Sequence, residues 1–175
     1  MIAPTAKIHA MACVDGVGGI GARSAVWQFA SVIRGAILGD DCNVASGATI
    51  DGSRFGDRCR IGHGVAMGPG FHIADDVFVG PNVTFCNDAW PRASKTGFDV
   101  SRFDGSRWAV TVDNGASIGA NAVIMAGVSI GANAMIAAGE VVRADVVANT
   151  LLIGGVARYY ETPLDKRERM RFAQC

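Results

Sequence analysis

The chain has 175 residues, and its 16 Lys and Arg side chains balance its 16 Asp and Glu side chains. This balance offers no basic field for nucleic acid and no polybasic stretch for a membrane surface, and no apolar run reaches the ~20 residues of a membrane span. The first residues lack the pattern of a signal peptide, and the five scattered cysteines form no CxxC pair. We therefore expect one cytoplasmic protein with free thiols.

A six-residue period begins at the N-terminus. Aliphatic residues recur at every sixth position nine times without a miss, at Ile2, Ile8, Val14, Ile20, Val26, Val32, Leu38, Val44 and Ile50. After a one-residue deletion the frame continues at Phe55, Ile61, Met67, Ile73, Val79 and Phe85, and it resumes later at Val112, Ile118, Ile124, Ile130, Ile136 and Val142. The fourth residue after each aliphatic is small or β-branched, with Phe71 and Glu140 as the clear exceptions.

This period predicts a chain wound around a triangular prism, with one short strand on each side. Neither an α-helix nor an isolated alternating strand repeats every six residues, and a β-sandwich would require turn signals every eight to twelve residues. Three hexapeptides make one coil, so the repeats predict about seven coils stacked at the ~4.8 Å inter-strand spacing. Glycines that directly follow the aliphatics are expected to supply a positive φ at the corners: Gly21, Gly39, Gly56, Gly62, Gly80, Gly119 and Gly131.

The repeat disappears over residues 86–111. This stretch carries side chains unlike those of the coils, namely Trp90, Pro91, Lys95, Arg102, Arg107 and Trp108. A long insertion in a compact domain is usually functional or disordered, and the aromatic and basic residues argue against disorder. We expect an excursion loop that leans on a neighbouring surface.

The C-terminus has a different pattern. In the stretch Thr162-Pro163-Leu164-Asp165 a Thr stands at the N-cap position, a Pro at the first helical position and an acid two residues further on. The pattern predicts a helix over roughly 163–173 and divides the chain into a β-helix domain (1–161) and a helical cap (162–175). Such a helix could close the last coil and satisfy its open edge, or its cations could meet phosphates.

Three segments resemble a known family. Residues 73–92, IADDVFVGPNVTFCNDAWPR, are similar to a signature of the hexapeptide-repeat acyltransferases that N-acetylate nucleotide-linked amino sugars. Residues 118–130 and the stretches 138–146 and 153–158 resemble the later coils and closing segment of the same family. The resemblance covers essentially the whole chain, and its most specific part is Asn-Asp-x-x-Pro-Arg. Cys86 stands where Thr is usual, and Gly155-Val156 replaces Asn-Pro, which affects the local turn.

The resemblance implies an all-β fold, a left-handed parallel β-helix, with an excursion loop and a short C-terminal helix. Spacing alone does not give the handedness, because the general crossover rule favours right-handed connections. The resemblance further implies a homotrimer with sites in the grooves between subunits. Acetyl-CoA is the implied co-substrate, and a nucleoside-diphosphate amino sugar, a precursor of cell-surface polysaccharide, is the implied acceptor.

The implied reaction is attack of a sugar amine on a thioester. Such an amine should titrate near the α-amino value of ~8, so a neutral fraction exists at pH 7 and a strong protein base is not essential. The site must hold the reactants together and place donors at the developing oxyanion. Asn87 matches the Asn of the motif and suits this positioning role, although an Asn also closes turns. His63 and His72 are candidate general bases or exposed corner residues, and His9 is expected to be structural.

The remaining candidates bind substrate and cofactor. Asp88, Trp90 and Arg92 follow Asn87 in the motif. Asp88 could bind sugar hydroxyls or cap the excursion, and Arg92 could pair with Asp88 or bind phosphate. The resemblance assigns four residues to CoA, of which the first two could equally serve repeat packing: Gly127, Ala138, Arg143 and Arg158.

Other functions of such a rod stay open. Hexapeptide rods of the γ-class carbonic anhydrases hold zinc with three His, but no two His here have the required spacing, so we expect no metal. The acceptor could instead be another small molecule, such as a free sugar or serine. A third possibility is a non-catalytic β-helix that acts as a binding scaffold.

Overall fold

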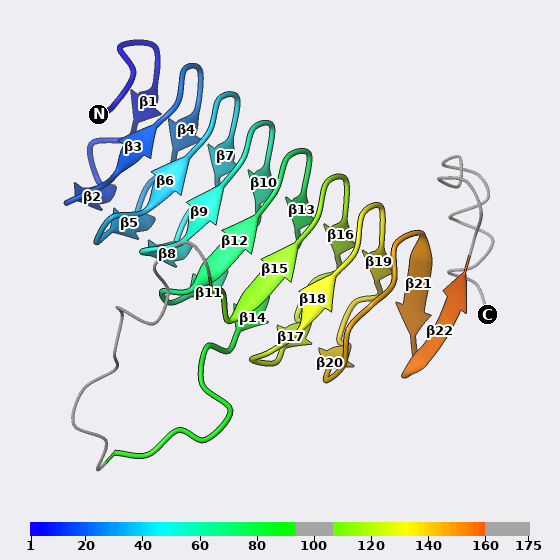
Figure 1. Ribbon diagram of the computed structural model, residues 1–175. Helices are drawn as coiled ribbons and strands as arrows, with labels where there is room; N and C mark the ends of the chain where they lie inside the picture. Colours follow the sequence, from blue (N-terminus) through cyan, green and yellow to red (C-terminus); the bar gives the residue numbers. More distant parts are fainter. Residues whose placement is uncertain (94–106, 160–175) are drawn as a thin grey trace.

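The computed structural model describes residues 1–93 and 107–159. This part of the chain is an all-β parallel solenoid of about seven coils (Figure 1), as the repeat predicts. The helix predicted over 163–173 and the domain boundary at 161–162 lie outside the described residues. The strands line up in three sheets, one on each side of the rod.

Each sheet takes every third strand of the rod. The nine-stranded sheet holds β1 (Lys7–Ile8), β4 (Ala25–Val26), β7 (Asn43–Val44), β10 (Arg60–Ile61), β13 (Phe78–Val79), β16 (Ser117–Ile118), β19 (Met135–Ile136), β21 (Thr150–Ile153) and β22 (Val156–Tyr159). The seven-stranded sheet holds β2 (Cys13–Asp15), β5 (Ser31–Ile33), β8 (Thr49–Asp51), β11 (Ala66–Met67), β14 (Thr84–Phe85), β17 (Val123–Ile124) and β20 (Val141–Val142). The six-stranded sheet holds β3 (Gly19–Ile20), β6 (Ile37–Leu38), β9 (Arg54–Phe55), β12 (Phe71–Ile73), β15 (Val110–Val112) and β18 (Ser129–Ile130).

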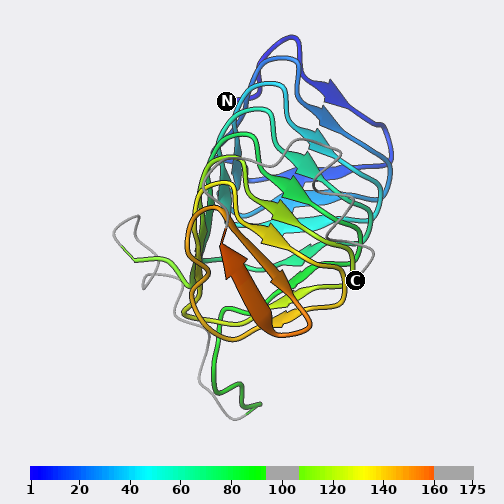
Figure 2. The same cartoon turned by 90° about the vertical axis from the view of Figure 1, so that its right-hand side faces the viewer.

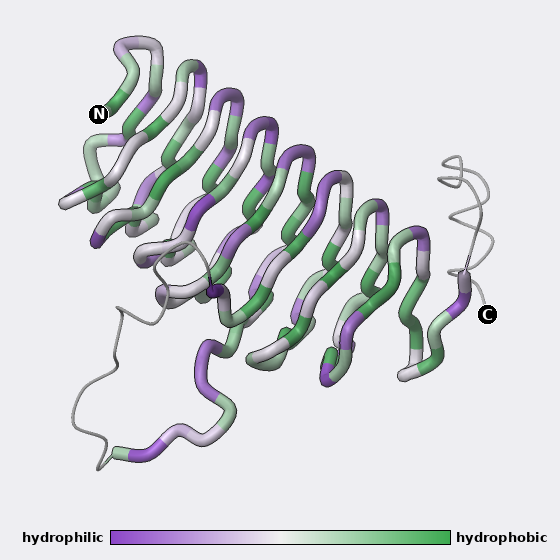
Figure 3. Tube along the Cα trace, viewed as in Figure 1, coloured by the Kyte–Doolittle hydropathy of each residue, from purple (hydrophilic) through white to green (hydrophobic). Residues whose placement is uncertain are grey.

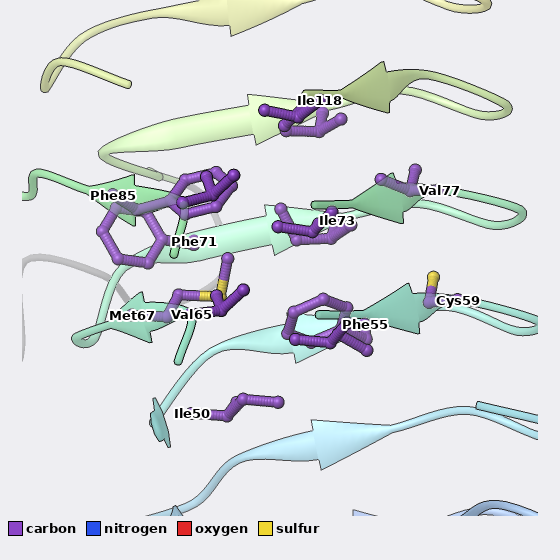
Figure 4. Close-up of a cluster of buried hydrophobic side chains, with 14 of the residues drawn as sticks. Ile50, Phe55, Cys59, Val65, Met67, Phe71, Ile73, Val77, Phe85 and Ile118 are labelled. Carbon is purple, nitrogen blue, oxygen red and sulfur yellow. The ribbon is translucent and has the colours of Figure 1, made fainter. Parts of the chain in front are cut away.

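The predicted aliphatic column forms the core. From Ile20 to Val142 every residue of the six-residue frame is buried, and hydropathy along the chain alternates between apolar strands and hydrophilic corners (Figure 3). Phe71, an exception to the small-residue pattern, is fully buried and packs its ring 5.3 Å from that of Phe85 (Figure 4). These two rings therefore fill the core at the level where the chain leaves the rod.

The prediction about the glycines that follow the aliphatics is wrong. None of the seven has a positive φ. That conformation occurs two residues later, on Gly64 after Gly62 and on non-glycine residues such as Arg23, Asp41 and Asn121 after the others. The glycines are needed for space, because each lies against the backbone of the next coil. A Cβ on Gly80 would lie 2.7 Å from the Ala120 nitrogen, closer than real Cβ atoms approach.

A hairpin closes the C-terminal end of the rod within the described residues. Strand β21 continues the nine-stranded sheet, and β22 turns back antiparallel to it (Figure 2). The turn residues Gly154 and Gly155 both have positive φ, which is the requirement of a tight two-residue hairpin turn. Glu140, the second exception to the repeat, accepts hydrogen bonds from both of their N–H groups. Its carboxylate holds the cap where a further coil would otherwise lie.

The corners between the sheets form three edges along the rod, which we name by their contents. The aspartate edge joins the six-stranded to the nine-stranded sheet and runs through residues 21–24, 39–42, 56–59, 74–77, 113–116 and 131–134. The histidine edge joins the nine-stranded to the seven-stranded sheet through 9–12, 27–30, 45–48, 62–65, 80–83, 119–122 and 137–140. The excursion edge joins the seven-stranded to the six-stranded sheet through 16–18, 34–36, 52–53, 68–70, 86–109, 125–128 and 143–145.

Candidate functional site

The excursion leaves the rod after β14 and returns at Val110, slightly earlier than the predicted residue 111 (Figure 1). Both of its limbs are fastened to the coil beneath. On the outgoing limb the Asn87 side chain donates to the Pro69 carbonyl (3.0 Å), and on the return limb the Ala109 N–H donates to the Gly70 carbonyl (2.7 Å). Two adjacent carbonyls on this edge therefore position the mouth of the excursion.

Asn87 is half-buried at this mouth, directly above the corner glycine of the coil below. Its Nδ2 would lie 2.8 Å from a Cβ on Gly68, so the glycine makes room for the amide. The hydrogen bond to Pro69 uses the nitrogen of the amide. Within residues 1–93 and 107–159, no group donates to its Oδ1. The side chain is thus held by its nitrogen and offers its oxygen as an acceptor.

The next motif residues start the excursion. The Asp88 carboxylate accepts a hydrogen bond from the Trp90 N–H (2.8 Å), which makes a local turn. Asp88 is half-buried, whereas Trp90 is 77% exposed and Arg92 is also exposed. Asp88 therefore takes part in the turn that starts the excursion, and Trp90 and Arg92 lie exposed beyond it.

His72 lies on the outer face of the six-stranded sheet, two residues beyond Gly70. Its ring stacks on Trp108 of the return limb, with 5.2 Å between centroids and 27° between planes. The Arg54 guanidinium, one coil below His72 in register, lies 5.4 Å from the same indole centroid. Trp108 therefore connects the return limb to two coils of the rod.

His63 is an exposed residue of the histidine edge, one full side of the prism away from Asn87. Its carbonyl accepts the Asn82 N–H of the next coil (2.8 Å). Ala138 belongs to the same edge, three coils above His63, and lines an apolar hollow of about 290 Å³ on the nine-stranded sheet. His63 and Ala138 are thus together on one edge but apart from Asn87 within a single chain. His9, half-buried in the first coil, accepts the Met11 N–H at its Nδ1 (3.1 Å).

Two of the predicted CoA residues share the excursion edge with Asn87. Gly127 has a φ of 92° and donates its N–H to the Ala109 carbonyl (2.7 Å), one coil above the return limb. Arg143 follows one coil later and lines a cavity of about 350 Å³ at the end of the rod. Arg158 is exposed on the cap strand β22, where it pairs with Leu151.

The aspartate edge carries charge that is used within the rod. Arg23 binds both oxygens of Asp41 (2.7 and 2.6 Å), and Arg58 does the same to Asp76 (2.7 and 2.8 Å). The hydrogen bonds from these arginines hold the pKa of each carboxyl below its usual range. A second column of side chains accepts backbone N–H groups from the coil before, at 2.8–2.9 Å: Asp40, Asp57, Asp75 and Asn114.

Over 1–93 and 107–159, no three His, Cys, Asp or Glu side chains gather closely enough to hold a metal ion. The same residues form no helix of the length and hydropathy that crossing a bilayer requires. The four cysteines of this part, Cys13, Cys42, Cys59 and Cys86, are free.

Comparison with known proteins finds the same six-residue repeat. The model of the bacterial transferase hexapeptide, six repeats long, matches residues 109–144, and that of the hexapeptide repeat of succinyl-transferase matches residues 20–51. Both matches fall on the regular coils described above. The chain therefore carries hexapeptide repeats of the kind that these transferase models describe. No curated protein matches the sequence.

Solved structures of hexapeptide-repeat proteins share the rod. A Vibrio cholerae acetyltransferase complexed with acetyl-CoA is 27% identical, with a TM-score of 0.53 over 85% of this chain and 73% of that one. AntD, an N-acyltransferase from Bacillus cereus with dTDP and coenzyme A, is 14% identical (TM-score 0.54; 99% and 86%). The Caulobacter crescentus GDP-perosamine N-acetyltransferase with CoA and GDP-perosamine is 20% identical (TM-score 0.51; 92% and 56%). This chain spans only a little over half the length of the Caulobacter protein.

The structure divides the residues predicted for the site between two edges of the rod. Asn87, His72, Gly127 and Arg143 lie on or beside the excursion edge, whereas His63 and Ala138 lie on the histidine edge. The contact of Trp108 with His72 and Arg54 was not predicted. The six-residue frame could have indicated this contact. His72 and Thr111 occupy the same outward position on adjacent coils, and Trp108 precedes Thr111 by only three residues.

Proposed function

We propose that the protein is an N-acetyltransferase that moves the acetyl group of acetyl-CoA to the amine of a nucleoside-diphosphate-linked amino sugar. The observation that carries this proposal is the presentation of Asn87. Its amide is fixed by Pro69 at the mouth of the excursion and keeps its oxygen available. That oxygen can accept a hydrogen bond from the substrate amine and orient its lone pair toward the thioester.

The reaction requires the protein mainly to hold the amine and the thioester in position. The amine nitrogen attacks the thioester carbonyl carbon, the C–N bond forms, the C–S bond breaks, and the amine proton passes to the departing sulfur. Because a sugar amine is partly neutral near pH 7 and a thiol titrates near ~8.5, neither step requires a strong base. The reaction therefore does not depend on the base-assisted route for which the sequence offers His63 and His72.

The partition of residues between two edges favours a site shared by subunits. We propose a homotrimer in which the excursion edge of one rod faces the histidine edge of the next, which would bring Ala138 toward Gly127 and Arg143. Asp88, Trp90 and Arg92 would contact the sugar nucleotide, and the guanidinium groups of Arg143 and Arg158 would serve the CoA phosphates. Closed rotational symmetry of this kind uses the flat sides of a straight rod.

The relatives support the same chemistry. AntD is an N-acyltransferase seen with dTDP and coenzyme A, and the Caulobacter enzyme is an N-acetyltransferase seen with CoA and a GDP-linked sugar. Both combine a nucleotide with CoA on this fold. The 27% identical Vibrio protein binds acetyl-CoA.

The test is thiol release from acetyl-CoA, followed with a thiol reagent over a panel of UDP-, dTDP- and GDP-linked amino sugars. We expect at least one to stimulate release, with an N-acetylated product identified by mass spectrometry. The matching sugar nucleotides without an amine serve as controls. Stimulation only by serine or free sugars would replace the proposed acceptor, and a protein that does not bind acetyl-CoA would be a scaffold.

A further inference from the structure

We propose that Trp108 is a positioning residue for the acetyl-transfer site and that His72 is its stacking platform rather than a general base. The inference rests on the proposed function, because it concerns how that site is held. Trp108 is half-buried, and it is the last large side chain before the chain rejoins the rod. The two groups against its ring, His72 and Arg54, both belong to the rigid six-stranded sheet.

The platform is built by the register of the coils. Arg54, His72 and Thr111 occupy the same outward position on the neighbouring strands β9, β12 and β15. An indole placed over two of these coils contacts a flat imidazole and a guanidinium at once. Stacking of aromatic rings and contact of a cation with a π-face are both attractive, so the return limb is fixed at the side chain as well as at the backbone.

The contact of Trp108 with His72 and Arg54 is linked to Asn87 through backbone hydrogen bonds. Ala109, next to Trp108, donates to the Gly70 carbonyl, and the preceding carbonyl, of Pro69, holds the Asn87 amide. Ala109 also accepts the Gly127 N–H from the coil above. Loss of the Trp108 contact would free the return limb and so loosen the stretch of the excursion edge that carries Asn87 and Gly127.

This arrangement assigns His72 a task that any flat ring can perform. What Trp108 uses is the face of the imidazole, at 5.2 Å between centroids, not a ring nitrogen. A phenyl ring has a similar face and no titratable proton. His72→Phe therefore separates stacking from proton transfer, and His72→Ala removes both.

The first experiment measures kcat and KM for the sugar-nucleotide reaction in the His72→Phe, His72→Ala and Trp108→Ala variants. We expect the two alanine variants to lose about tenfold in kcat with little change in KM for acetyl-CoA, because the reacting groups are misaligned rather than unbound. His72→Phe should recover to within about threefold of the wild type and keep its pH–rate profile. If His72→Phe is as impaired as His72→Ala, or loses one limb of the pH–rate profile, the platform role is wrong.

A second experiment does not depend on activity. The rates of tryptic cleavage after Arg92 and Arg107, two exposed residues at the two limbs, are followed by mass spectrometry on the folded protein. We expect cleavage to rise about fivefold or more in Trp108→Ala and His72→Ala, because protease access follows local opening, and to stay near wild type in His72→Phe. Trp27→Ala, an exposed tryptophan far from the excursion, is the matched control and should not change cleavage.

The two measurements distinguish failure of the proposed function from failure of the role proposed for Trp108. If no sugar nucleotide is acetylated but the cleavage pattern follows the prediction, the role of Trp108 in fixing the return limb is supported and the proposed function is wrong. If cleavage in Trp108→Ala equals that of the wild type, Trp108 does not fix the return limb and the inference is overturned whatever the activity.

Discussion

Two edges of the same rod differ in what their polar side chains bind. On the aspartate edge, carboxylates and guanidinium groups repeat from coil to coil and bind one another or the backbone of the coil before. On the excursion edge Arg34 binds Asp51 in the same manner, but at the mouth of the excursion Asn87 is fixed by its nitrogen while its oxygen stays without a donor among the described residues. The paired charges of the aspartate edge are therefore structural.

The difference shows what identifies a site on a repetitive scaffold. Polar side chains that repeat on successive corners all serve one purpose: they accept the backbone N–H groups of each turn. A side chain whose hydrogen-bonding capacity is only half used, at the one corner where the repeat breaks, has no counterpart on neighbouring coils. Function is expected where the repeat cannot explain the residue.

The largest stability effect should come from the space between coils. A Cβ on Gly39 of the aspartate edge would lie 2.5 Å from the Gly56 carbonyl oxygen, whereas Gly35 of the excursion edge has a φ of 81° and nothing within 4 Å of a Cβ. We expect Gly39→Ala to cost about 3 kcal/mol through overpacking and Gly35→Ala about 1 kcal/mol through strain alone. Urea unfolding measures both, and equal costs would contradict the steric explanation.

A smaller effect is expected at the C-terminal cap, where a charged side chain again serves the fold. The Glu140 carboxylate accepts the Gly155 N–H at 3.2 Å and also that of Gly154. Glu140→Ala should cost about 1–2 kcal/mol, because it leaves the turn N–H groups without their protein partner. Hydrogen exchange at Gly154 and Gly155 should accelerate before the rest of the rod unfolds. Unchanged protection there would show that the hairpin does not depend on Glu140.

The smallest effect should be the pH dependence of the aspartate edge. Hydrogen bonds from Arg23 lower the pKa of Asp41 in the folded chain. The stabilisation is therefore present above the ordinary carboxyl value of ~3.9 and is lost as the pH falls through the lower folded value. Asp41→Asn should remove part of the loss of Tm seen on acidification below about pH 4. Asp15→Asn, at an exposed carboxylate without an ion pair in the described part of the chain, should leave that loss intact.

The sequence predicted the rod well because its frame is set by burial at every sixth residue. The break after Phe85, the number of coils and the core positions all follow from that frame. The corner conformations did not, because two effects compete there. Steric exclusion by the next coil selects Gly80 and its equivalents, while Asn121 and even Arg23 accept a positive φ. A one-dimensional pattern does not show which of the two constraints falls on which residue.

The candidate site was predictable only in part, for a related reason. The sequence places Asn87 at the break but does not say that Gly68 makes room for its amide or that Pro69 holds it. The stack of His72 on Trp108 joins residues 36 positions apart across the excursion. Contacts of this kind depend on where an irregular segment returns, and no repeat encodes that path.

The most direct test of the account compares the same substitution on the two edges. Asn87→Ala removes a side chain that donates to Pro69 at 3.0 Å, and Asn114→Ala removes one that accepts from Asp75 at 2.9 Å. Acetyl transfer to the best sugar nucleotide should fall about 100-fold in kcat for Asn87→Ala and by less than about threefold for Asn114→Ala, with similar Tm values for both. Equal activity in the two variants would contradict the claim that the excursion edge carries the function.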